Sequence, residues 1–131
     1  MERIKRNWHI YVAISTCIVW AIWANGCVKQ EFKTNAYKTL AAGAAIYESG
    51  YPAFLELHRM GLVTDAQKEA GKVFAIKYWA AYHAASDALI AYDAVDSAEN
   101  KDRVRVALDE AVRCLSTLSA YVQPFLSKGV K

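Results

Sequence analysis

The sequence predicts an all-α fold, an antiparallel up-down-up three-helix bundle preceded by an N-terminal apolar helix. Three observations carry this prediction. Residues 7–28 form a run without any formal charge. After that run, apolar residues recur at spacings of 3 and 4, the period of one helix face, and no stretch alternates over the length of a strand. Two turn-forming stretches, 61–64 and 96–100, divide this pattern into three helices, and short connections between long helices give antiparallel neighbours.

The N-terminal segment has the layout of a signal or membrane anchor. Basic residues Arg3, Lys5 and Arg6 precede a fifteen-residue apolar core that runs from Ile10 to Ala24. A secretory signal combines a basic start with about 7 to 15 apolar residues, whereas a bilayer-spanning helix needs about 20. The length of the core therefore favours a signal.

The core is followed by Ala24-Asn25-Gly26-Cys27, and with it the segment resembles the signal peptide of a bacterial lipoprotein. The resemblance covers the first 27 residues. It implies cleavage after Gly26 and lipidation of Cys27, which becomes the first residue of the mature chain. It also implies attachment to the cell membrane or outer membrane of a bacterium, with the helical part on the periplasmic or extracellular side.

Two other interpretations of this segment remain open. A retained signal anchor would span the membrane with its basic end inside, and residues 8–26 would then contact the lipid. An ordinary buried helix of a soluble protein is the third interpretation. The chain accordingly divides into a lipoprotein signal peptide or membrane anchor, 1–26, a tether, 27–34, and a helical bundle domain, 35–131.

The helical body is nearly neutral. The chain has a formal net charge of +3, and residues 1–26 contribute three basic side chains and one acidic one, +2, which leaves +1 for the rest. Such a domain has no electrostatic reason to bind nucleic acid, so no nucleic-acid partner is predicted. Cys17 would leave with the signal and Cys27 would be acylated, so Cys114 would have no disulfide partner in its own chain. We expect Cys114 to be buried.

The first bundle helix is predicted from Asn35 to about Met60. Its apolar face comprises Tyr37, Leu40, Ala44, Tyr47, Tyr51, Phe54 and His58. Because Pro52 lacks an amide donor, a kink or a short break is expected near Gly50. Gly61, which can adopt the left-handed conformation, is expected to end the helix.

The second and third helices have recognisable boundaries. Thr64 and Gln67 have capping-box spacing, and the second helix is predicted from Asp65 to about Val95. Ser97 or Asn100 is expected to cap the third helix. The apolar seam of that helix comprises Val104, Leu108, Ala111, Leu115, Leu118, Val122 and Phe125. Pro124 is expected to end or bend it and to leave a frayed tail.

The positions of the turns predict which residues lie level with one another. A first turn centred at Leu62 and Val63 places the small residues of 40–45 against the aromatic residues of 79–83, with Ala42 or Gly43 in contact with His83. A second turn centred near Ala98 places His83 level with about Arg113. It also places Asp87 within one turn of Arg105 or Arg113, which favours an ion pair or a polar residue that fixes the helix register.

The sequence predicts no catalytic residue, no metal ligand and no cofactor. By register His58 and His83 lie about 24 Å apart along the bundle, at roughly 1.5 Å per residue, too far for one haem or metal site. His83 beside Cys114 would suggest an activated nucleophile, but no orienting residue accompanies them. Histidines satisfied by neighbouring groups in the core are the favoured interpretation.

The tyrosines of the bundle have two interpretations: ordinary packing residues of the fold, which is the favoured one, and candidate binding residues. The bundle contains more of them than a core of this size can bury, and tyrosine is favoured at protein interfaces. The candidate interaction surface comprises Tyr47, Tyr51, Tyr78, Tyr82 and Tyr92. We therefore expect a membrane-anchored envelope lipoprotein that binds or scaffolds an unidentified protein partner without catalysis. The alternative is a single-span integral membrane subunit that is an accessory part of a larger complex.

Overall fold

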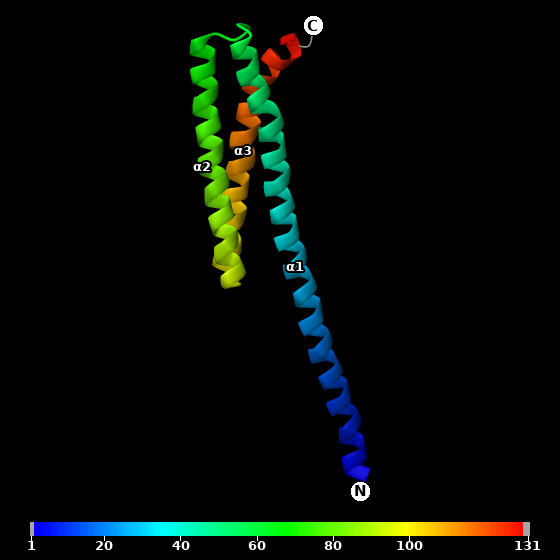
Figure 1. The fold of residues 1–131 in the computed structure, drawn as a ribbon. Helices are drawn as coiled ribbons and strands as arrows, with labels where there is room; N and C mark the ends of the chain where they lie inside the picture. Colours follow the sequence, from blue (N-terminus) through cyan, green and yellow to red (C-terminus); the bar gives the residue numbers. More distant parts are fainter. Residues whose placement is uncertain (1, 130–131) are drawn as a thin grey trace. The chain divides into compact units, whose positions relative to one another are not determined.

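A computed structural model describes the backbone of residues 2–129 and the side chains of residues 30–129. Within these residues the chain is helical and without strands, and its elements are α1 (Glu2–Arg59), α2 (Asp65–Ala94) and α3 (Ala98–Gly129) (Figure 1). The predicted all-α class and its helical-bundle packing are thus confirmed. A search of the described residues finds no helix long and apolar enough to cross a membrane. Cys27 and the segment 8–26 lie outside the residues whose side chains are described.

The chain divides into two compact units, Met1–Asn35 and Ala36–Lys131. α1 runs through the boundary as one helix, so residues 27–34, which were expected to form a tether, are helical. The sequence from Val28 to Ala42 contains neither glycine nor proline. Polar residues of mixed charge are compatible with a helix as well as with a linker, and composition alone does not separate the two.

In the second unit, residues 36–59 of α1 pack with α2 and α3, and consecutive helices run in opposite directions (Figure 1). The ring of Tyr47 in α1 lies 5.4 Å from that of Tyr78 in α2. The ring of Phe74 in α2 lies 5.2 Å from that of Tyr121 in α3. Both pairs match the levels that the positions of the two turns predict.

The helix ends follow the predicted capping chemistry. Gly61 has a φ of 76°, its N–H donates to His58 O, and Leu62 N–H donates to Leu57 O at 2.9 Å, the Schellman arrangement. Thr64 and Gln67 form the complete capping box at the start of α2. Ser97 Oγ accepts a hydrogen bond from Asn100 N–H at 3.1 Å at the start of α3.

Both prolines of the chain lie inside helices. Pro52 lies inside α1, which is not interrupted there, and Pro124 lies inside α3, which continues to Gly129. The expectation of a break near Gly50 and the expectation that α3 ends at Pro124 are therefore wrong. In Figure 1 the last turns of α3, in red, lean away from the rest of that helix, so the alternative expectation of a bend at Pro124 describes it better.

The core lies where the three helices meet. Its largest fully buried side chains are Tyr78, Tyr92, Phe54, Leu89 and Val104. Five of the seven predicted seam positions in α3 are buried, and the other two, Leu108 and Phe125, are half-buried. Every buried side chain among the described residues is apolar or aromatic, so the core is held together by packing rather than by polar networks.

Glycines allow the helices to approach closely. A Cβ added at Gly71 of α2 would lie 2.6 Å from the Phe54 ring of α1. A Cβ at Gly43 of α1 would lie 3.1 Å from the Tyr78 hydroxyl and 3.5 Å from Leu115. The predicted contact of Gly43 with His83 is therefore wrong, because Tyr78, five residues earlier in α2, occupies that place.

Candidate interaction surfaces

Aromatic side chains of α1 and α2 form a continuous partly exposed cluster, which we call the aromatic surface and which comprises Tyr47, Tyr51, Trp79, Tyr82 and His83. The Tyr47 ring lies 5.4 Å from Tyr51 and 5.0 Å from Trp79. Trp79 in turn lies 5.2 Å from Tyr82 and 5.6 Å from His83. These spacings are those of favourable aromatic pairs, so the neighbours hold each ring in place.

The structure separates the five predicted tyrosines into two groups. Tyr47, Tyr51 and Tyr82 are half-buried and belong to the aromatic surface. Tyr78 and Tyr92 are each only 2% exposed and belong to the core. Burial raises the pKa of the Tyr78 hydroxyl, as it does that of Tyr51.

Trp79 is the residue that sequence reasoning left out, and it contacts most members of the aromatic surface. The predicted levels already placed it opposite α1. Trp79 lies three residues before Tyr82 and four before His83, the helical spacing that puts side chains on one face. This spacing could have placed Trp79 in the aromatic surface from the sequence.

The two described histidines are not core residues. His58 is half-buried at the end of α1, and its Nε2 lies 2.7 Å from Asp65 Oδ1 at the start of α2. The hydrogen bond and the charge of His58 hold the pKa of the Asp65 carboxyl below its ordinary value. His83 is exposed and stacks on Trp79. The expectation of buried histidines is therefore wrong, and His58 instead links the two sides of the first turn.

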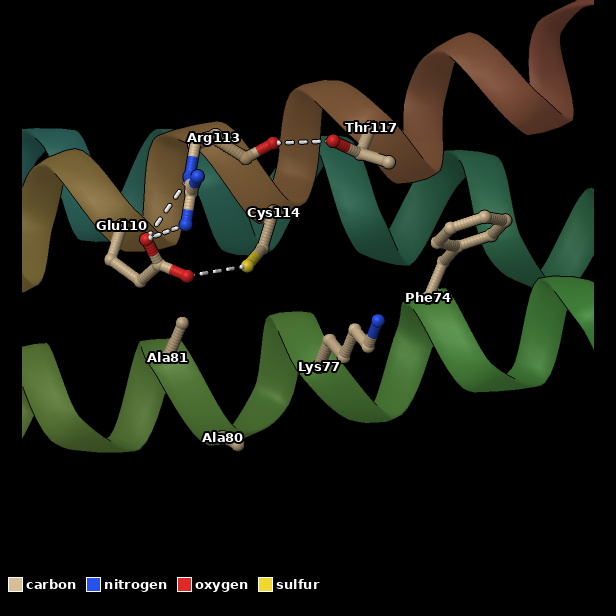
Figure 2. Close-up of a pocket in the computed structure, with 8 residues that line it drawn as sticks. All are labelled: Phe74, Lys77, Ala80, Ala81, Glu110, Arg113, Cys114 and Thr117. Carbon is tan, nitrogen blue, oxygen red and sulfur yellow. Dashed lines mark hydrogen bonds and ion pairs between the residues drawn. The ribbon is translucent and has the colours of Figure 1, made fainter.

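A second feature is an open groove between α2 and α3, which we call the α2–α3 groove. It consists of two hollows of about 540 and 600 Å³ that share Ala81 and Glu110. Figure 2 shows the first hollow, whose eight lining residues all belong to α2 and α3. The second hollow is lined by Ala81, Ala84, Ala88, Glu99, Asp102, Arg103, Val106, Ala107 and Glu110.

Cys114 lies in the wall of this groove and is half-buried, so the expectation that it is buried is wrong (Figure 2). Its thiol donates to Glu110 Oε1 at 3.5 Å. Burial, followed by the hydrogen bond and charge of Glu110, raises the pKa of the thiol. His83 is not among the residues that line the hollow. Because the active form of cysteine is the thiolate, this environment is the opposite of the one that activates a nucleophile.

The arginines of α3 form ion pairs within their own helix. Arg113 pairs with Glu110 and Arg103 with Glu99. Arg105 lies 3.4 Å from Asp102. Asp87 is exposed and forms an ion pair with neither Arg105 nor Arg113, so that prediction is wrong.

Among the residues that the structure describes, no three histidine, cysteine or acidic side chains are grouped so that they could hold a metal ion. The fold and the two surfaces define a class, a small helical-bundle protein with an aromatic surface and an open groove. No protein-family model matches the chain, no curated protein matches it, and no solved structure matches it.

Proposed function

We propose that this protein is a small envelope lipoprotein that is held at a bacterial membrane by Cys27 and acts as a binding or scaffolding module without catalysis. One observation carries the proposal. The uncharged run of residues 7–28 has a basic start and ends in Ala24-Asn25-Gly26-Cys27, the layout of a signal whose cysteine is lipidated. The bundle would then lie on the periplasmic or extracellular side of the cell membrane or outer membrane.

The aromatic surface supports the binding role. Five ring side chains of α1 and α2 lie in mutual contact and keep part of their area exposed. Rings fixed by their neighbours lose little conformational entropy on binding, and aromatic residues are enriched at protein interfaces. We propose this surface as the place where a protein partner binds.

The second candidate function is that of a single-span membrane subunit, accessory to a larger complex. The same uncharged run favours it, because 22 residues would be enough for a membrane span if the signal is not cleaved. The two candidate functions differ in whether residues 1–26 are cleaved and whether Cys27 is acylated.

An intact-mass measurement of the protein extracted from bacterial membranes separates the two candidates. The lipoprotein predicts loss of residues 1–26 and added acyl mass on Cys27. The Cys27→Ser variant should lose both changes, whereas the Cys114→Ser variant should keep them. An unprocessed chain that begins at Met1 and has no acyl group would contradict the lipoprotein and favour the single span.

The binding role is tested by a photocrosslinking amino acid placed at position 83 or, in α3, at position 123. His83 is exposed within the aromatic surface, while Gln123 is exposed on another helix. We expect one defined crosslinked product from position 83 in intact cells and none from position 123. Equal crosslinking from both positions would show that contact is unselective and would contradict a binding role for the aromatic surface.

A further inference from the structure

The exposed face of α2 has a helical repeat of its own, which we call the α2 seam. Seven exposed positions follow one another at alternating spacings of 3 and 4, and these positions are Val73, Ile76, Ala80, His83, Asp87, Ile90 and Ala94. Ile76 is 58% exposed and Ile90 is 62% exposed. Alternating spacings of 3 and 4 form the heptad repeat by which one helix packs along another. The α2 seam therefore has the spacing of a coiled-coil interface over about 32 Å, at roughly 1.5 Å per residue.

The α2 seam faces away from the bundle. The buried residues of α2 are Gly71, Ala75, Tyr78, Ala81, Ala85, Leu89 and Tyr92. At about 3.6 residues per turn, they lie on the side of the helix opposite the seam. The core is on that opposite side, so the whole seam stays exposed within the described bundle.

The order of residues along the α2 seam complements its own reverse order about the level of Ala85. Two antiparallel copies with their axis at this level pair residues that lie equally far before and after it. The pairs are Ile76 with Ala94, Ala80 with Ile90, and His83 with Asp87. Each isoleucine thus meets an alanine, and each polar side chain meets the other polar one. Both the sizes and the polarities match, as in closely packed specific interfaces.

We propose that the α2 seam binds the α2 seam of a second, antiparallel copy of this chain, about a two-fold axis at the level of Ala85 and perpendicular to the helix. In each copy the ring N–H of His83 donates to the Asp87 carboxylate of the other. Among the described residues Asp87 forms no ion pair within its own chain, so its carboxylate can accept this hydrogen bond. A polar pair inside an apolar seam fixes the register and orientation of the helices.

Other arrangements of two α2 seams lose this match. A parallel pair brings His83 against His83 and Asp87 against Asp87. An antiparallel pair shifted by one heptad brings Asp87 against Ile76 or against Ile90. A carboxylate buried against an aliphatic side chain has no hydrogen-bond donor, which is costly. The pattern therefore selects a second copy of this chain and one register.

This inference rests on the binding or scaffolding role proposed above and names the partner. The α2 seam adjoins the aromatic surface, with which it shares His83. In the proposed dimer the α1 helices of the two copies run in opposite directions. Two chains anchored through Cys27 would therefore come from facing membrane surfaces, and the dimer would join those surfaces.

Complementation between two variants tests this arrangement in the full chain purified in detergent, with sedimentation velocity as the measurement. We expect a dimer that Asp87→Lys and His83→Glu each weaken by about tenfold, because each change replaces both polar pairs with mismatched ones. An equimolar mixture of the two variants should dimerise within about threefold of the original chain. In the mixed dimer one pair is the original His83 with Asp87, and the other joins the two new side chains, which have opposite charges. Because the variants are separate chains, this rescue cannot arise within a monomer.

Asp109→Lys is the matched control, because it makes the same charge reversal at an exposed aspartate of α3. It should leave the dissociation constant unchanged, and circular dichroism checks that each variant keeps its helicity. A chain that stays monomeric at about 100 μM, far above a micromolar dissociation constant, would overturn the proposal. So would a mixture that dimerises no more tightly than either variant alone. If the chain stays monomeric while position 83 crosslinks to a different protein, the proposed binding role stands and this inference falls.

A disulfide trap gives an independent result. Ala80→Cys and Ile90→Cys are made separately in the Cys114→Ser chain, mixed and oxidised mildly. We expect an 80–90 disulfide between the two chains, identified by mass spectrometry of the linked peptides. Val112→Cys, exposed on α3 and outside the α2 seam, should give no such link with Ala80→Cys. Disulfides of 80 with 80 and of 90 with 90 in place of the 80–90 disulfide would show a parallel dimer and would contradict the proposed axis.

Discussion

At the scale of single residues, the packing of α1 against α2 depends on the missing side chain of Gly71. A Cβ there would lie 2.6 Å from the ring of Phe54, which is fully buried. We expect Gly71→Ala to destabilise the bundle by about 1 to 3 kcal/mol, the usual cost of overpacking. Urea denaturation followed by circular dichroism measures this change.

Gly50→Ala is the matched control for that prediction. Gly50 also lies inside a helix, but a Cβ there would meet no atom within 4 Å. It should stabilise the protein by about 0.5 to 1 kcal/mol, because alanine favours the helical backbone. If the two substitutions changed the free energy of unfolding in the same direction, the proposed role of close packing at Gly71 would be wrong.

The pair of His58 and Asp65 makes the first turn sensitive to acid. Because the pKa of Asp65 is lowered from its ordinary value of 3.8, its contribution to stability is complete above that value and is lost as the pH falls through the folded-state pKa. We expect NMR titration of the Asp65 carboxyl to give a pKa below 3.8 and the His58→Gln variant to move it upward. An unchanged titration in that variant would show that the hydrogen bond at 2.7 Å does not form in solution.

At the scale of helices, the start of α2 depends on the Thr64 cap. Thr64 Oγ1 accepts from Gln67 N–H at 3.2 Å, and Gln67 Oε1 accepts from Thr64 N–H at 2.9 Å. Thr64→Ala should lower the free energy of unfolding by about 1 kcal/mol, because it leaves an amide at the helix start without its partner. Ser49→Ala, an exposed change inside α1, should be neutral or slightly stabilising in the same thermal or urea denaturation. Equal losses in both variants would contradict the capping role.

The ends of the helices were predictable from the sequence. The effect of a proline inside a helix was less predictable. Gly61, Thr64 and Ser97 each act through bonds that span three to five residues, so local sequence contains all that is needed. Pro52 and Pro124 also have local effects, yet both lie within continuous helices. The lost hydrogen bond at a proline costs about 3 kcal/mol, and tertiary packing on the flanking turns can exceed that cost.

At the scale of the whole molecule, the sequence predicted the level of residues along the bundle better than their direction around each helix. The contacts of Tyr47 with Tyr78 and of Phe74 with Tyr121 have the expected levels. His83 and Cys114 are at similar levels but point to different surfaces, one to the aromatic surface and one to the groove. The position of a turn determines the level of a residue along the bundle. The direction of its side chain around the helix depends on which side chains fill the core, and that depends on all three helices together.

The buried hydroxyl of Tyr78 makes the stability of the bundle depend on pH at the alkaline side. Burial raises its pKa above the ordinary value of 10.0. The stability that Tyr78 contributes is therefore complete below about pH 10 and is lost as the pH rises through the folded-state pKa. We expect the midpoint of thermal unfolding to fall more steeply between pH 9 and 11 in the original chain than in Tyr78→Phe, as followed by circular dichroism. Identical pH profiles would contradict the burial of this hydroxyl.

The glycine contacts also crowd the part of the bundle beside the first turn. Gly71 meets Phe54 and Gly129 meets Leu57, one helical turn further along α1, and a Cβ at either glycine would lie 2.6 Å from its neighbour. Random mutagenesis should therefore find few tolerated substitutions by larger residues at Gly71 and Gly129, since Phe54 and Leu57 already occupy the space beside them. Ala84 in the middle of α2 is exposed, and that position should accept larger residues. Over many generations, the positions beside the first turn should therefore vary less than exposed positions such as 84.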